Sequence, residues 1–300
     1  MILFKIINYN KLAVIFFLLF STFSFSQNEF THDSYWLERE NKTAIIGANN
    51  CYIRNAPSVN AALLDSLQIG KEVLILKSTE NTLNIKGINV SWIQIQYTDK
   101  NKEIKTGFLW KGFLALGFQK NKQNTFLTTI DKIGTITKDN FHQEMFSISV
   151  KILDNNNNLF HQKTIQKNIT DSFYFEDKLI GGLGLKNISE IYRISFNGEA
   201  CGIPSLFYYF AWNNKNLVTL PEKYNVGDAG VFYHSENFIF PKETGGKPGL
   251  IVKKVKEAES NEESKEYVFN VSEWSETYKW NGEKANFISK SKIKKYTEKE

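Results

Sequence analysis

The residues with the clearest capacity for chemistry are Cys201 and His234, because a cysteine thiol becomes a nucleophile when a histidine accepts its proton. Such a thiol also needs surroundings that stabilise the thiolate, usually the N-terminus of a helix. Residues 203–210 follow the cysteine and combine a proline with four aromatic side chains, which favours a strand. The sequence therefore predicts no enzyme, and a hydrolase built on this Cys–His pair is the alternative.

A second chemical pattern is the alternation of Asp154, Asn156 and Asn158, which has the spacing of a calcium-binding loop. Such a loop needs a glycine at its sixth position and a bidentate acid at its twelfth, where this chain has Leu159 and Ile165. A solvated hairpin turn is therefore predicted. The remaining histidines are scattered without metal-ligand spacing: His32, His142 and His161. We predict no metal and no cofactor.

Residues 1–26 are predicted to be a signal peptide. An apolar run at 12–20 follows a lysine-containing start, and it is too short to span a bilayer. Ser24 and Ser26 supply the small residues that precede a cleavage site. We expect an exported protein, periplasmic or secreted, with no integral membrane segment after cleavage. An uncleaved membrane anchor is the alternative.

Export raises the prospect of a disulfide between the two cysteines of the chain, Cys51 and Cys201. An oxidising compartment permits such a bond, and it would connect two predicted domains. The alternative is a pair of buried free thiols, a common state for cysteine.

Composition indicates an all-β protein of about two domains. Aromatic residues make up 14% of the 300 residues, and they combine with abundant Ile, Val and Thr, which favours strands. Abundant Asn and Lys with little Ala argue against a helical bundle. The net charge of +5 comes without an arginine-rich patch, so no nucleic-acid partner is predicted.

A short motif at residues 50–58 identifies the first domain. Residues 51–53 have high β propensity, and the Asn-Ala-Pro-Ser that follows Arg54 favours a turn. The motif resembles the ΦxVRxGPS signature of bacterial SH3-like (SH3b) domains, with Ala56 where the family usually has glycine. Further segments that resemble the family follow in order, at residues 60–76, 91–97, 105–110 and 112–114. The resemblance implies a small SH3-like barrel over residues 43–117.

Exposed aromatic side chains on a small β-barrel are a usual platform for peptides or glycans. The candidate binding residues are Tyr52, Arg54, Trp92 and Trp110. Both tryptophans lie on strands that form the core in SH3b domains, so packing is their alternative role. The expected partner is a cell-wall glycan or peptide, or an envelope protein.

The rest of the chain contains an internal repeat with an offset of 44 residues. Residues 194–207 align with 238–251, and each copy reads as strand, glycine-containing turn, proline and strand. The repeat resembles the core of FG-GAP/VCBS-type propeller repeats, whose calcium-binding acids are replaced here. This implies a β-rich, propeller-like domain over 118–300. The alternatives are a partial propeller and an irregular β-sandwich. A lead-in segment is expected at 27–42, and solvated segments at 257–263 and 290–300.

Because SH3b domains often accompany cell-wall hydrolases, the Cys–His pair needs comparison with that class. Residues 200–204 and 227–234 loosely resemble the DCSG and HxG motifs of cell-wall cysteine endopeptidases, but the Asp before the cysteine and the Ser after it are absent. The repeat also explains Cys201 as a turn residue. We therefore predict a non-enzymatic exported envelope protein that binds peptidoglycan or a protein partner. The alternatives are a cell-wall cysteine peptidase or amidase that uses Cys201 and His234, and an exported inhibitor or immunity-type protein.

Overall fold

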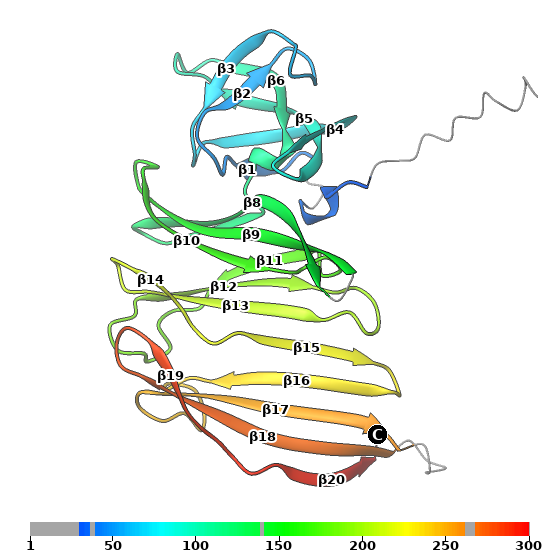
Figure 1. Ribbon diagram of the computed structural model, residues 1–300. Helices are drawn as coiled ribbons and strands as arrows, with labels where there is room; N and C mark the ends of the chain where they lie inside the picture. Colours follow the sequence, from blue (N-terminus) through cyan, green and yellow to red (C-terminus); the bar gives the residue numbers. More distant parts are fainter. Residues whose placement is uncertain (1–29, 37–39, 139–140, 262–267, 300) are drawn as a thin grey trace, which may run out of the picture. The chain divides into compact units, whose positions relative to one another are not determined.

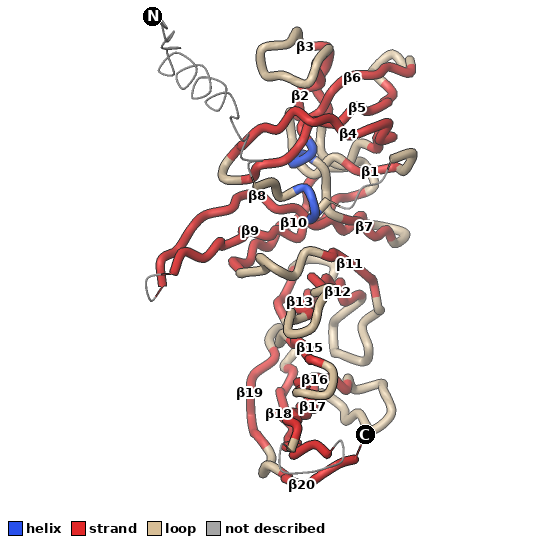
Figure 2. Tube along the Cα trace, turned by 90° about the vertical axis from the view of Figure 1, so that its right-hand side faces the viewer, coloured by secondary structure: helices blue, strands red, loops and turns tan. Residues whose placement is uncertain are grey.

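The computed structural model describes residues 30–36, 40–138, 141–261 and 268–299, so the predicted signal peptide lies outside the described residues. The described chain consists of strands joined by turns, which confirms the all-β prediction (Figures 1 and 2). Its helical segments are two single 3₁₀ turns, η1 (Asp33–Tyr35) and η2 (Lys111–Phe113). No helix in these residues has the length and hydropathy needed to span a bilayer.

The first sheet is antiparallel and has the strand order β1-β4-β5-β6-β2-β3 (Figure 1). Its strands are β1 (Thr43–Ile45), β2 (Cys51–Arg54), β3 (Leu63–Leu67), β4 (Glu72–Ile85), β5 (Ile88–Thr98) and β6 (Ile104–Trp110). The β-prone residues 51–53 and the family-like segments 91–97 and 105–110 lie within β2, β5 and β6. A bridge between Ile46 and Leu114 connects the end of β1 to the residues after β6.

The segment before β1, where the sequence predicts a lead-in at 27–42, contributes two aromatic side chains to the core. Tyr35 and Trp36 are only 2% and 4% exposed. The Tyr35 hydroxyl donates to the carbonyl oxygen of Ile169 at 3.0 Å, and the Trp36 indole N–H donates to the carbonyl oxygen of Leu114 at 3.0 Å. Because buried aromatic rings need a partner for their polar atoms, these two bonds fix both rings in place.

The second sheet is also antiparallel, with the order β10-β9-β8-β7. Its strands are β7 (Gly117–Lys120), β8 (Asn124–Lys138), β9 (Phe141–Asp154) and β10 (Leu159–Lys167). The turn between β9 and β10 is the segment with calcium-like spacing. There the Asp154 carboxylate accepts the backbone N–H groups of Asn156 and Asn158 at 2.8 and 2.9 Å. This side-chain bonding closes the hairpin, so the predicted turn is confirmed.

The third sheet has ten strands in the described chain. They are β11 (Tyr174–Leu179), β12 (Glu190–Asn197), β13 (Ser205–Trp212), β14 (Leu217–Thr219), β15 (Lys223–Asp228), β16 (Phe232–Ile239), β17 (Leu250–Ser260), β18 (Val268–Trp280), β19 (Ala285–Lys290) and β20 (Lys294–Lys299). The order is β11-β12-β13-β15-β16-β17-β18-β19, with β14 beside β13 and β20 beside β18.

The two copies of the internal repeat form the hairpins β12–β13 and β16–β17. Both hairpins belong to the same continuous sheet, because β15 pairs with β13 on one side and with β16 on the other. A propeller would instead separate them into blades around a channel. The repeat therefore builds successive hairpins of one antiparallel sheet, which corrects the propeller-like prediction.

Two charged segments that were expected to be a solvated loop and a frayed end contain strands. Residues 257–260 complete β17, and residues 294–299 form β20 along the edge of β18. Opposite charges explain the second case, because Lys294 stands opposite Glu273 and the Tyr296 hydroxyl donates to the Glu273 carboxylate at 2.6 Å.

All three sheets contribute to one connected hydrophobic core. It includes Trp92 from the first sheet, Phe126 and Phe146 from the second, and Tyr192 from the third. The ring centroids of Phe126 and Tyr192 are 5.6 Å apart, so the second and third sheets are in direct contact. Residues 31–300 form one compact unit, and the expected boundary at 117/118 falls inside this shared core.

Candidate functional site

The four predicted binding residues separate into a buried pair and a surface pair. Trp92 and Trp110 stand opposite each other on β5 and β6 and are 4% and 3% exposed. The Trp110 indole N–H donates to the carbonyl oxygen of Leu83 at 2.8 Å. Both rings therefore pack in the core, which corrects their assignment to a binding surface. Tyr52 remains 49% exposed, and Arg54 is half-buried beside it.

Strand alternation explains why Tyr52 and Arg54 share the outer face of β2. The residues between and before them, Ile53 and Cys51, are fully buried. The Arg54 guanidinium carbon lies 6.0 Å from the centre of the Tyr52 ring. One guanidinium nitrogen, Nη1, donates to the carbonyl oxygen of Ala61 at 2.6 Å. This bond holds the arginine against the loop between β2 and β3, so the positive charge has a defined position.

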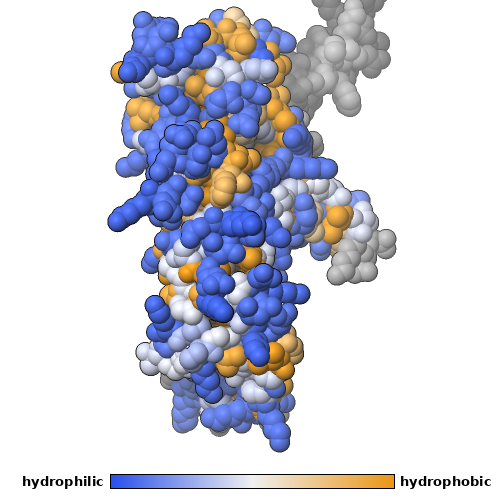
Figure 3. Space-filling model, turned by 90° about the vertical axis from the view of Figure 1, so that its left-hand side faces the viewer, coloured by the Kyte–Doolittle hydropathy of each residue, from blue (hydrophilic) through white to orange (hydrophobic). Residues whose placement is uncertain are grey.

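The surface around this pair also carries aliphatic side chains that sequence reasoning missed. Leu63 and Leu64 on β3 are 55% and 51% exposed. Two consecutive leucines in a strand point to opposite faces, so one of them must lie outside the core. The adjacent leucines in the sequence could therefore have predicted an exposed apolar side chain. Leu63 stands opposite Arg54 and shares its face, and we call Tyr52, Arg54 and Leu63 the β2–β3 surface. Elsewhere, as on the face in Figure 3, apolar side chains form separate patches among hydrophilic ones.

The predicted disulfide is not formed, because both cysteines are free. Cys51 is fully buried in the first sheet, where its thiol donates to the carbonyl oxygen of Ala48 at 3.3 Å. Burial raises the pKa of this thiol to about 12. Cys201 is exposed in the turn between β12 and β13.

The Cys–His pair lacks the arrangement that nucleophilic catalysis needs. Cys201 lies in a turn between two strands, not at the start of a helix. His234 is buried, and its Nδ1 lies 2.9 Å from a carboxylate oxygen of Glu257. Its Nε2 lies 3.3 Å from Glu236, within ion-pair distance but off the line of a hydrogen bond. Since both nitrogens face carboxylates, neither is directed at a thiol. The ring also stacks on Tyr224 at 4.1 Å.

His234 belongs to a row of ionisable side chains that crosses β16, β17 and β18. Lys253 lies 3.1 Å from Glu236 and 3.3 Å from Glu276, so one ammonium joins two carboxylates. Burial alone would raise the pKa of Glu276, but the Tyr278 hydroxyl and Lys253 hold it below its usual value. The charges of Glu236, Lys253 and Glu276 are paired, and this pairing offsets the cost of burying them. The described residues contain no group of His, Cys, Asp or Glu arranged to hold a metal ion.

Comparison of the chain with protein-family models, with curated proteins and with solved structures finds no match.

Proposed function

We propose that the chain is a non-enzymatic exported protein of the bacterial envelope that binds peptidoglycan or a protein partner through its first sheet. In this proposal the first sheet is an SH3-like barrel and the β2–β3 surface is its contact region. The observation that carries the proposal is the half-exposed Tyr52 ring beside a guanidinium that is held in place.

The chemistry of this surface favours a ligand that carries a carboxylate. Arg54 has five N–H donors, and Ala61 accepts from one of its nitrogens. Within the described residues, no carboxylate lies at ion-pair distance from it. A planar guanidinium can bind a carboxylate through two parallel hydrogen bonds, while the Tyr52 ring and Leu63 cover apolar parts of the same ligand. The stem peptides of peptidoglycan and acidic segments of envelope proteins both have this chemistry.

The proposal is tested by sedimentation with purified cell-wall sacculi, using the chain from residue 27 onward. We expect the wild-type protein to sediment with sacculi, and Tyr52→Ala to weaken binding about tenfold, because exposed aromatic anchors carry much of the energy of such contacts. Tyr174→Ala is the matched control, since this tyrosine is 37% exposed on β11. Equal binding by both variants would remove the β2–β3 surface from the proposal.

Crosslinking in intact envelopes separates the two kinds of partner. Capture of a single protein, with loss of this capture in Tyr52→Ala, would support a protein partner. Such a partner could also be the target of the chain if the chain is an inhibitor. Absence of both sedimentation and crosslinking would refute the proposed function.

A further inference from the structure

The last two strands of the chain form an open edge of the third sheet. Strands β19 and β20 follow one another along one side of β18, while β17 pairs with its other side (Figure 1). Between them the backbone N–H of Ser291 donates to the carbonyl oxygen of Ser275 at 2.8 Å, so the chain stays beside β18. No described strand pairs with the outer side of β19 or β20. Backbone N–H and C=O groups on that side are therefore open to a further strand.

The opposite edge of the same sheet is in contact with the second sheet. There the Gln119 side-chain amide on β7 donates to the carbonyl oxygen of Asp177 on β11 at 3.3 Å and to its carboxylate at 2.7 Å. A Cβ atom at Gly117 would lie 2.6 Å from a ring carbon of Phe175, so the backbone of β7 lies directly against β11. Of the two edges of the third sheet, only the β19–β20 edge is left uncovered by the described chain.

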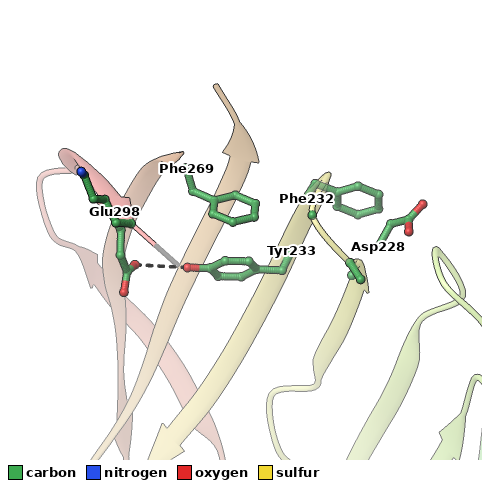
Figure 4. Close-up of a pocket in the computed structure, with 9 residues that line it drawn as sticks. Asp228, Phe232, Tyr233, Phe269 and Glu298 are labelled. Carbon is green, nitrogen blue, oxygen red and sulfur yellow. Dashed lines mark hydrogen bonds between the residues drawn. The ribbon is translucent and has the colours of Figure 1, made fainter. Parts of the chain in front are cut away.

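The inner side of β20 is held firmly by the sheet. Its Glu298 carboxylate accepts a hydrogen bond from the Tyr233 hydroxyl at 3.4 Å, as Figure 4 shows, and it forms an ion pair with Lys256. These partners lie on β16 and β17, so β20 is tied to strands beyond its neighbour β18. A strand that is already ordered loses little conformational entropy when another strand pairs with it.

The open edge is strongly basic. Residues 285–298 contain four lysines and one acid, Glu298, which is already paired. Among the described residues, no carboxylate lies at ion-pair distance from Lys292 or Lys295. Lysines at a sheet edge oppose pairing with a second copy of the same chain, because like charges would meet. The same charges attract a strand that carries carboxylates.

Apolar side chains are exposed beside these lysines. Phe287 and Ile288 on β19 are 57% and 51% exposed, and Ile293 between the two strands is 49% exposed. A partner that covered them would remove apolar surface from water, which favours association. The edge therefore combines open backbone groups, positive charge and apolar side chains along one line.

We infer that the β19–β20 edge binds an acidic, extended segment of a partner protein, which adds to the third sheet as a further strand. In this mode of recognition the main-chain hydrogen bonds supply affinity, and contacts with alternate side chains supply specificity. The lysines select carboxylates in the added strand, and the exposed apolar side chains contact the residues between them. The inference does not rest on the proposed function, because the β2–β3 surface belongs to a different sheet.

The probe is a capped synthetic peptide of about eight residues, with glutamate at every second position and valine between. It is titrated into the deuterated, ¹⁵N-labelled chain from residue 27 onward and followed by NMR. We expect saturable shifts of amide signals in residues 285–298. Alternate amide protons of residues 294–298 should also exchange more slowly with solvent, because the added strand bonds them. Contact with lysine side chains alone would leave these amides open.

Charge reversal separates this edge from other lysines of the sheet. The double variant Lys292→Glu with Lys295→Glu should weaken peptide binding at least about tenfold, because two attractions become repulsions. Lys254→Glu is the matched control, since this exposed lysine lies on the inner strand β17, and we expect a change of at most about twofold. Tyr52→Ala should bind the peptide as tightly as the wild type, so this test and that of the proposed function fail independently.

A modified peptide tests the backbone pairing without any change to the protein. Methylation of two adjacent backbone nitrogens at its centre removes donors from both sides of the peptide and keeps its charge, so binding should weaken at least about tenfold. The inference is overturned if the methylated peptide binds as tightly as its parent, or if the amides of residues 294–298 exchange no more slowly at saturation. Tighter binding of polyphosphate to the same residues would also overturn it, in favour of a polyanion site.

Discussion

Truncation of Trp36 to alanine tests whether the segment before β1 belongs to the fold. This ring is 4% exposed and its indole N–H donates to the Leu114 carbonyl oxygen. Removal of a buried tryptophan side chain costs about 3–5 kcal/mol, because apolar contacts are lost and a cavity remains. The lost hydrogen bond places the expected value toward the upper part of this range. For a chain of this size the corresponding decrease in melting temperature is roughly 8 °C.

The measurement is equilibrium unfolding in urea, followed by far-UV circular dichroism so that the loss of a tryptophan does not affect the signal. Phe287→Ala is the control, and because its ring is 57% exposed we expect a change within about 0.5 kcal/mol. If Trp36→Ala changed the free energy of unfolding by less than about 1 kcal/mol with an unchanged m-value, residues 31–36 would not be part of the core.

Three further predictions concern single groups. Tyr35→Phe should lower the free energy of unfolding by about 1–3 kcal/mol in urea titrations, because a buried carbonyl loses its donor; a neutral effect would contradict this. A thiol reagent at neutral pH should label Cys201 in the native protein and Cys51 only after unfolding. If mass spectrometry found two labels on the native protein, this prediction would be wrong. Burial alone would raise the pKa of Asp131, but Lys151 and neighbouring hydroxyls hold it below the ordinary 3.8. The carboxylate therefore stabilises the fold above about pH 4 and loses this contribution as pH falls through its lowered pKa. Asp131→Asn should flatten the dependence of urea stability on pH in that acidic range, and an unchanged slope would refute the argument.

The strands of the first sheet were predictable because their signals are local. Residues 91–97 alternate between apolar and polar types, and the turn after Arg54 uses residues that favour turns. The same alternation does not show how deeply each face is buried. In β5 the residues from Ile88 to Ile93 are buried on both faces, because η1 packs against this strand and the Ser91 hydroxyl donates a hydrogen bond to the Asp33 carboxylate at 2.7 Å. This contact joins residues 58 positions apart, and no local pattern reports it.

The third sheet shows where local patterns end. Hairpins form at both copies of the predicted repeat, but Phe196 lies within β12 whereas Phe240 follows the end of β16. Whether such hairpins form blades or one sheet depends on β15, whose pairing with both neighbours is decided by long-range contacts. The lysine-rich end of the chain has the composition of a frayed tail. It becomes a strand because Glu273 and Lys256 offer opposite charges to it.

The candidate site residues were only half predictable for a related reason. Sequence alternation places Tyr52 and Arg54 on one face of β2, but it does not distinguish an exposed tryptophan from a buried one on a strand such as β5 or β6. The open β19–β20 edge gave no sequence signal, because the composition of its lysine-rich part predicts a frayed end.

The buried ion pair between Lys151 and Asp131 bears on how the proposed binding surface is supported. The Lys151 ammonium lies 3.0 Å from Asp131 and donates at 2.9 Å to the carbonyl oxygen of Gly47, which follows β1. One buried charge on β9 is therefore satisfied partly by the backbone of the first sheet. Because a buried charge without partners is costly, Lys151 needs the Gly47 carbonyl oxygen for as long as its ammonium stays buried. The β2–β3 surface is thus part of a sheet that is stabilised by the rest of the chain, and it differs in this respect from a binding module that folds alone.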